Sequence, residues 1–315
     1  MPNKAENSSV VVKSGIIYQA ISGFYYVWSD GESYATKPRG NFRHQQMKPL
    51  VGDRVKFEND ESDSQSNSRL IEIAPRRNQL VRPTVSNVDY ALVVTSLIEP
   101  DFSYNLLDYF LVSVEAHDIQ PLILLTKYDL LLEQKGQVEA EALVGEITEL
   151  YAKVGYKVVV LDGTKASYDR LGTHIEDALY VIMGQSGVGK STLLNHMLPD
   201  AQIETSAISD ALNRGRHTTR EVTLYRYNEG LLADTPGFSA IEFTTLEKAE
   251  LQTCFPEILE ASNECKFRSC LHINEPGCAV KAQWEAGEIA ESRYQNYLQI
   301  FERIEQRKPV YRKKN

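Results

Sequence analysis

No stretch of this 315-residue chain is apolar over the roughly 20 residues that a helix needs to cross a bilayer. The first residues are polar, and no apolar run among them resembles a secretion signal. The chain has four cysteines, too few for a disulfide scaffold at this length. We therefore expect a cytoplasmic protein that does not associate with membranes. The length allows two or three domains.

The chain also has no overall excess of positive charge, because its formal net charge is −9. An even spread of that charge would argue against nucleic acid as a partner. The charge is uneven, however: residues 37–82 hold ten Lys/Arg against six Asp/Glu, and residues 300–315 hold six against two. Such basic regions are compatible with a specific RNA partner and equally with ordinary solvated surfaces. Charge alone therefore leaves the partner open.

The pattern of apolar residues changes twice along the chain. Near the N-terminus, short alternating runs such as Phe24–Trp28 and Leu70–Ile73 predict a small β-barrel or sandwich. From about residue 88 to 237, continuous apolar strands alternate with helical patterns, which is typical of a mainly parallel sheet covered by helices. Beyond residue 245 the pattern is helical and ends in a long helix over Ile289–Lys308.

A phosphate-binding loop is predicted at Gly184–Ser191, because GQSGVGKS matches the pattern G-x-x-x-x-G-K-S between a strand and a helix. Backbone N–H groups and the helix N-terminus would face phosphate oxygens. Lys190 would reach the β- and γ-phosphates, and Ser191 would ligate Mg²⁺. The expected nucleotide-binding residues here are Gly184, Gln185, Ser186, Gly187, Val188, Gly189, Lys190, Ser191 and Thr192. The pattern predicts a nucleoside triphosphate without specifying the base.

The base is predicted by Thr126–Asp129, TKYD, which follows an apolar strand and fits the pattern [NT]-K-x-D. The Asp129 carboxylate would accept two hydrogen bonds from guanine, whereas adenine cannot donate this pair. Lys127 would pack along the base, and Thr126 would brace the phosphate loop. Alone, the tetrapeptide could be an ordinary helix start; together with a phosphate loop it predicts GTP.

A sensor of the γ-phosphate is predicted at Asp234–Gly237, DTPG, at the end of a strand. Asp234 would hold Mg²⁺ through water, and the Gly237 N–H would bond the γ-phosphate. A lone tetrapeptide of this kind is often only a turn. Upstream of it, Thr218 or Thr219 would complete the Mg²⁺ shell, with Thr219 favoured.

The glutamine that positions water in many GTPases is absent, because Phe238 follows Gly237. Slow intrinsic hydrolysis is therefore expected unless another group helps. His217 is the candidate, either to position water or as a base, and it could equally contact only a partner or phosphate. The catalytic candidates are thus His217, Thr219 and Lys190.

The order of these motifs is unusual, since the guanine loop precedes the phosphate loop. Either Thr126–Asp129 is spurious or the domain is circularly permuted, with its usual ends joined through Gly163–Leu179. Permutation is feasible because domain termini usually lie on the surface and often close together. The sensor would then lead directly into the C-terminal region.

A closed metal site is predicted from Cys265, Cys270, His272 and Cys278, which lie within fourteen residues. Three thiolates and one imidazole suit a structural zinc with no open coordination position. The alternative is a group of buried thiols with an incidental histidine.

Together these motifs resemble the RsgA family, also called YjeQ or YloQ, of circularly permuted GTPases that depend on the small ribosomal subunit. The resemblance runs over nearly the whole chain and includes Arg39-Gly-Asn-Phe-Arg, Val51-Gly-Asp-Arg-Val, Asn78-Gln-Leu-Val-Arg-Pro, Thr126–Asp129, Gly184–Ser191, Arg214-Gly-Arg-His-Thr-Thr, Asp234-Thr-Pro-Gly-Phe and Cys265–Cys278.

The resemblance implies a multidomain α/β chain. We expect an RNA-binding OB-fold β-barrel over residues 1–75, a circularly permuted P-loop GTPase domain over 76–245 and a helical zinc-knuckle domain over 246–315. It further implies late maturation of the small ribosomal subunit, with hydrolysis stimulated by that subunit. The expected partners are 16S rRNA and its proteins, the expected cofactors are GTP or GDP, Mg²⁺ and one structural Zn²⁺, and a monomer is expected.

Two alternatives stay open. One is a GTP-gated rRNA-binding module whose hydrolysis is incidental; the other is an ATPase or kinase, if the guanine loop is accidental. The chain also departs from the family, which usually places a Ser-Ala-Lys-like loop behind the guanine, where this chain has Leu161–Thr164. The RNA contacts expected in the barrel are Tyr25, Tyr26, Trp28, Arg39, Arg43, Lys48 and Arg54, although the aromatics could equally form its core.

Overall fold

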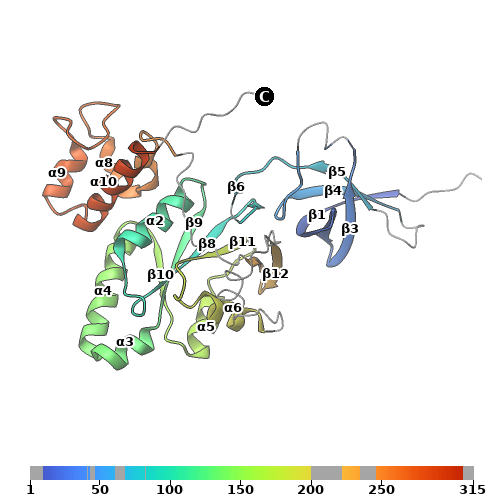
Figure 1. Cartoon of the computed structure of the whole chain (residues 1–315), viewed down its shortest axis with the longest axis horizontal. Coiled ribbons are helices and arrows are strands. Elements are labelled where there is room, and N and C mark those ends of the chain that lie inside the picture. The colour runs from blue at the N-terminus through green and yellow to red at the C-terminus, as the bar shows by residue number, and fades with distance from the viewer. Residues whose placement is uncertain are drawn as a thin grey trace, which may run out of the picture. The chain divides into compact units, whose positions relative to one another are not determined.

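The computed structural model of the chain describes residues 10–40, 42, 47–60, 68–81, 83–199, 222–234 and 246–307 (Figure 1). The chain folds into two compact units that interleave along the sequence. Unit 1 contains residues 1–90, 172–182 and 194–238, and unit 2 contains residues 91–171, 183–193 and 239–315.

The N-terminal part of unit 1 is a closed five-stranded barrel. Its strands are β1 (Val10–Ile21), β2 (Phe24–Ser29), β3 (Glu32–Pro38), β4 (Arg54–Asp60) and β5 (Ser68–Ile73). They follow the order β1-β2-β3-β5-β4, and β4 pairs back with β1, which closes the sheet. Ile17, Val27 and Phe57 are fully buried inside it. The predicted small barrel is confirmed.

Unit 1 also holds a strand layer that reaches the barrel. A short hairpin of β6 (Gln79–Leu80) and β7 (Val85–Ser86) follows β5. Further along the chain, β11 (Leu179–Met183) pairs in parallel with β13 (Gly230–Asp234), and β13 pairs antiparallel with β12 (Thr223–Tyr227). At Gln19 and Thr223, β12 pairs with β1.

Unit 2 contains a strand layer with helices. The strands are β8 (Tyr90–Ser96), β9 (Gln120–Thr126) and β10 (Lys157–Val160), with β9 in the middle and parallel to β10. The helices are α2 (Tyr104–Glu115), α3 (Tyr128–Lys135), α4 (Gln137–Lys153) and α5 (Lys165–Gly172). Helix α6 (Lys190–Met197) begins in unit 2, and its residues from Leu194 onward belong to unit 1. Strand β8 is almost entirely buried, which agrees with its continuous apolar sequence.

The C-terminal segment of unit 2 is helical. It consists of a 3-10 helix η3 (Leu251–Cys254), α8 (Pro256–Ser262), α9 (Ala279–Glu285) and α10 (Glu291–Glu305). Buried residues of these helices share a core with Tyr109 and Val112 of α2. The Arg293 side chain is buried there, 2.6 Å from both Asp108 and Glu257. The boundaries of the three expected domains stay predictions.

Among the described residues, none of the helices is both long and apolar enough to cross a membrane.

Candidate functional site

The predicted phosphate loop connects β11 to α6, and α6 begins at Lys190. The Lys190 ammonium donates hydrogen bonds to the carbonyls of Gly184 and Gln185, each at 2.6 Å. The side chain therefore folds back onto its own loop, where its positive charge could meet a bound anion. Burial lowers the pKa of Lys190. A phosphate at this position would supply the negative charge that the half-buried ammonium lacks.

Gly184 begins the loop at a position where no side chain fits. A Cβ atom there would lie 2.2 Å from the Val94 carbonyl oxygen of β8, and its φ of +149° is strained for other residues. The loop backbone thus packs directly on β8, which fixes its path. Val188 is buried within the loop.

Thr126 connects the guanine loop to the phosphate loop. Its hydroxyl donates a hydrogen bond to the Val188 carbonyl at 2.7 Å and lies 3.2 Å from the Thr95 carbonyl. Because Thr126 ends β9 and Val188 lies in the phosphate loop, this bond holds the two loops at one edge of the strand layer. The bracing contact expected from the sequence is present.

The next residues of the guanine loop have defined conformations. Lys127 takes the left-handed conformation, with φ of +62°, and its ammonium donates to the Glu99 carbonyl. Asp129 lies in the first turn of α3. Its carboxylate faces the loop after β10, since a Cβ atom on Gly163 would lie 2.9 Å from Asp129 Oδ2. Gly163, at φ of +77°, leaves space in front of the carboxylate.

The loop Leu161–Thr164 is held in shape because Asp162 forms a turn within it. Its carboxylate accepts hydrogen bonds from the Thr164 hydroxyl at 2.5 Å and the Thr164 N–H at 3.0 Å. The Thr164 hydroxyl is the main cause that lowers the pKa of Asp162. An Asp-Gly-Thr turn therefore lies beside Asp129.

The structure brings only part of the predicted nucleotide site together. The phosphate loop, Ser191, Thr192 and the guanine loop are described and lie in unit 2. His217, Thr218, Thr219, Gly237 and the side chain of Asp234 lie outside the described residues, so their roles stay predictions.

The predicted metal ligands form a compact group in unit 2. The ligand atoms of Cys265, Cys270, His272 and Cys278 all lie within 4.8 Å of one another. Cys265 Sγ and Cys278 Sγ are 4.0 Å apart, and His272 Nδ1 lies 3.6 and 3.5 Å from these two sulfurs. Zinc at about 2.3 Å from sulfur and about 2.0 Å from nitrogen gives tetrahedral edges of about 3.8 and about 3.5 Å. The donor set therefore fits a closed zinc site.

The surroundings of His272 support metal binding through Nδ1. Its Nε2 lies 2.8 Å from Gln252 Oε1, a partner that holds the ring with Nδ1 facing the sulfurs. Burial lowers the pKa of His272, which favours the neutral imidazole that a metal requires. The Tyr294 hydroxyl donates to the His272 carbonyl at 2.7 Å and fixes the backbone.

Three groups that shape these sites were not predicted from the sequence. The Glu99 carbonyl and the Gln252 side chain act from positions without any motif, so no sequence signal identifies them. The Asp162 turn has a signal, the short Asp-Gly-Thr segment directly after a strand.

Family models match most of the chain. The model described as RsgA GTPase matches residues 73–244, and the model described as RsgA N-terminal domain matches residues 14–65. The small ribosomal subunit biogenesis GTPase RsgA of Enterococcus faecalis is 52% identical over 306 residues, covering 97% of this chain and 100% of the relative. The protein of the same name from Limosilactobacillus reuteri is 48% identical over 305 residues, with coverage of 96% and 100%.

Solved structures are similar over the same length. YloQ, described as a circularly permuted GTPase, has a TM-score of 0.82 at 40% identity and covers 98% of this chain and 100% of its own. YjeQ from Thermotoga maritima has a TM-score of 0.81 at 31% identity, with coverage of 95% and 100%. The reversed order of guanine and phosphate loops is thus a genuine permutation, and the chain belongs to the RsgA family of GTPases.

Proposed function

We propose that this chain is a GTPase of small ribosomal subunit maturation, which binds the late subunit and hydrolyses GTP as a checkpoint. The observation that supports this most directly is the pairing of an intact phosphate loop with a guanine loop, held together by Thr126 and Val188. A relative named for small-subunit biogenesis is 52% identical over 97% of this chain. We further propose a cytoplasmic monomer that contacts 16S rRNA through its barrel.

In this proposal, the described loops bind and orient the nucleotide. Asp129 accepts the two donors of guanine, and the Gly163 turn lies beside this carboxylate without a side chain to obstruct it. Lys190 exchanges the carbonyls of Gly184 and Gln185 for phosphate oxygens, so no buried charge is left unpaired.

Mg²⁺, bound by Ser191, Thr219 and water on Asp234, would neutralise charge that develops on the phosphates. The Gly237 N–H would sense the γ-phosphate, while Thr218 is the alternative metal ligand. His217 would position the attacking water in place of the missing glutamine.

The decisive experiment compares GTP hydrolysis by the purified chain with and without small ribosomal subunits, using ATP as the control nucleotide. We expect slow GTP turnover that rises strongly with subunits, and no comparable ATP turnover. Turnover that is indifferent to the subunits would contradict the checkpoint.

A second candidate is a GTP-gated rRNA-binding module whose hydrolysis is incidental. Phe238 favours it, because a phenylalanine cannot orient water by hydrogen bonding. Unchanged release from the subunit when hydrolysis is blocked with a non-hydrolysable GTP analogue would support this candidate over the checkpoint.

A further inference from the structure

The barrel of unit 1 contains a cavity of about 610 Å³ beside the end of β3. Ten described residues line it, of which Lys37, Arg39 and Lys48 are cationic and none is acidic. Tyr25 and Phe42, both nearly buried, lie among its apolar lining residues with the exposed Met47. A positive rim over apolar walls is complementary to a nucleotide, which carries a phosphate beside a flat base.

We propose that this cavity binds one nucleotide of single-stranded RNA, with its phosphates on Lys37 and Lys48 and its base against Met47. The inference rests on the proposed function in taking RNA to be the partner. The inference adds the location of one RNA-binding site in the barrel, which the amino-acid composition does not give.

The cationic side chains are available for phosphate. Lys37 and Lys48 are exposed, and the Lys37 ammonium lies 4.4 Å from the Phe24 ring centre and pairs with no carboxylate of the described residues. Arg39 is different, because it pairs with Glu58 at 2.5 Å. The Arg39 side chain is 46% exposed and that of Glu58 is 28% exposed, so this ion pair is weak. A phosphate can therefore replace Glu58 as the partner of the guanidinium at a small cost in free energy.

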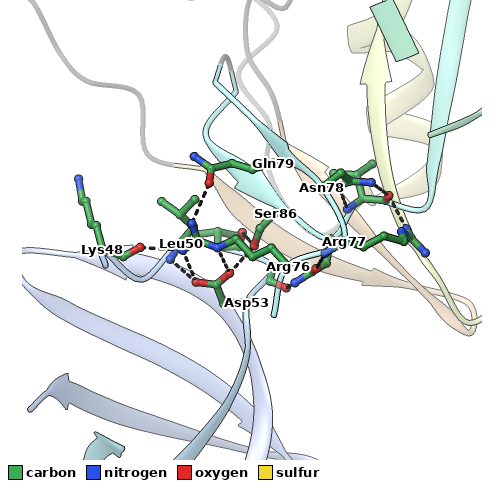
Figure 2. A network of polar contacts seen from close by, with 12 residues as sticks. Lys48, Leu50, Asp53, Arg76, Arg77, Asn78, Gln79 and Ser86 are labelled. Atoms are coloured by element: carbon green, nitrogen blue, oxygen red, sulfur yellow. Dashed lines mark hydrogen bonds and ion pairs between the residues drawn. The ribbon is translucent and has the colours of Figure 1, made fainter. Parts of the chain in front are cut away.

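A network of polar contacts holds one wall of the cavity in place (Figure 2). The Arg76 guanidinium binds both carboxylate oxygens of buried Asp53, at 2.7 and 2.8 Å, and donates to the Lys48 carbonyl at 2.7 Å. Asp53 also accepts from the Leu50 N–H and the Ser86 hydroxyl. The backbone that carries Lys48 is therefore fixed before RNA binds, which lowers the entropy cost of binding.

Charge distinguishes this cavity from one in unit 2. That second cavity, of about 540 Å³, is lined by six glutamates, which would repel a phosphate backbone. The glutamates are Glu146, Glu149, Glu257, Glu260, Glu264 and Glu288. Of these two cavities, only the barrel cavity suits RNA.

The test uses the full chain and an oligouridylate of about 12 nucleotides, a length within the range that one OB fold covers. The double variant Lys37→Ala/Lys48→Ala should bind about tenfold more weakly. For this variant, the slope of log affinity against log salt concentration should be less steep by about 1.4, because each lost phosphate contact contributes about 0.7 to the slope for single strands. Met47→Ala should weaken binding about three- to tenfold without changing this slope, because it removes an apolar contact only.

Lys135→Ala/Lys157→Ala is the matched control, since both lysines are exposed and lie in unit 2. Identical affinity and slope for the two double variants would overturn the inference. So would tighter binding of an oligoglutamate peptide than of the oligouridylate, which would identify an acidic protein as the partner.

GTP hydrolysis with small subunits is measured in parallel, so that failure of the RNA site can be distinguished from failure of the proposed function. If small subunits stimulate the parent chain but the Lys37→Ala/Lys48→Ala variant binds oligouridylate as the parent does, only the proposed RNA site in the cavity is refuted. A parent chain that small subunits do not stimulate would refute the proposed function.

Discussion

At the scale of single residues, we expect base selection to depend on the two carboxylate oxygens of Asp129. Asp129→Asn replaces one acceptor with a donor, so the side chain should no longer pair with guanine and should pair with the 2-oxo group of xanthine instead. Two charge-assisted hydrogen bonds at about 1.5–3 kcal/mol each imply a loss of GTP affinity of about a hundredfold or more. Competition between GTP and XTP measures the change in base preference. Glu133→Gln is the control, because Glu133 is an exposed acidic residue on the same helix, α3. An unaltered preference for GTP would remove Asp129 from the site.

We expect phosphate binding to depend more on Lys190 than on any other side chain of the loop. In the described structure its ammonium has only backbone carbonyl partners, and burial lowers its pKa. Lys190→Ala should therefore lower GTP affinity by about a hundredfold or more, because a buried charged contact to phosphate is lost. The measurement is titration with a fluorescent GTP analogue. Lys157→Ala should bind as the parent does, and equal affinity of the Lys190 variant would count against the loop.

At the scale of elements, the Arg76–Asp53 pair fastens the segment after β5 to the barrel (Figure 2). Lysine cannot reproduce a bidentate carboxylate contact together with a bond to the Lys48 carbonyl. Arg76→Lys should leave buried Asp53 partly unpaired and lower the free energy of unfolding by about 1–3 kcal/mol. Urea denaturation measures the loss. Arg69→Lys, on the exposed side of β5, should change stability by less than about 0.5 kcal/mol.

The same network links the barrel to the strands of unit 1. Next to Arg76, Arg77 binds Asp89 at 2.7 Å, and the other carboxylate oxygen of Asp89 accepts from the Leu179 N–H at 2.7 Å. Leu179 is the first residue of β11, which leads into the phosphate loop. A short chain of hydrogen bonds therefore connects the barrel segment to the start of the strand that carries the loop.

At the scale of the whole molecule, we expect a zinc ion at the Cys265, Cys270, His272 and Cys278 cluster to stabilise the C-terminal segment. Cys270 and Cys278 belong to the core shared by α2, α8 and α10, and Cys265 packs against it, so we expect zinc binding and the packing of this segment to be coupled. Cys270→Ser should abolish stoichiometric zinc and lower the unfolding temperature, while GTP affinity changes little because the nucleotide loops use other residues. Metal analysis and calorimetry measure these effects.

Cys254→Ala is the informative control for that experiment. Cys254 is fully buried in the same core but is not among the clustered ligands. Its substitution should lower stability while retaining one zinc. Retention of zinc by the Cys270 variant would contradict the assigned ligand set.

Much of the architecture followed from local pattern. Strands β8, β9 and β11 carry the continuous apolar runs that predict a mainly parallel sheet, since buried parallel strands carry no polar alternation. β3 was not expected, because Glu32, Ser33 and Thr36 gave it no apolar pattern; it forms through pairing with β2 and β5. Tertiary contacts thus overrode a weak local signal.

The sequence alone determined the chemistry of the sites, because phosphate loops, guanine loops and zinc ligands are short and depend on residue type at fixed spacing. Only the tertiary structure decided what surrounds them. It placed Gly163 before Asp129, turned Gln252 toward His272 and gathered Lys37, Arg39 and Lys48 around one cavity. These contacts join residues that no local pattern relates, and they depend on how strands and loops close in space.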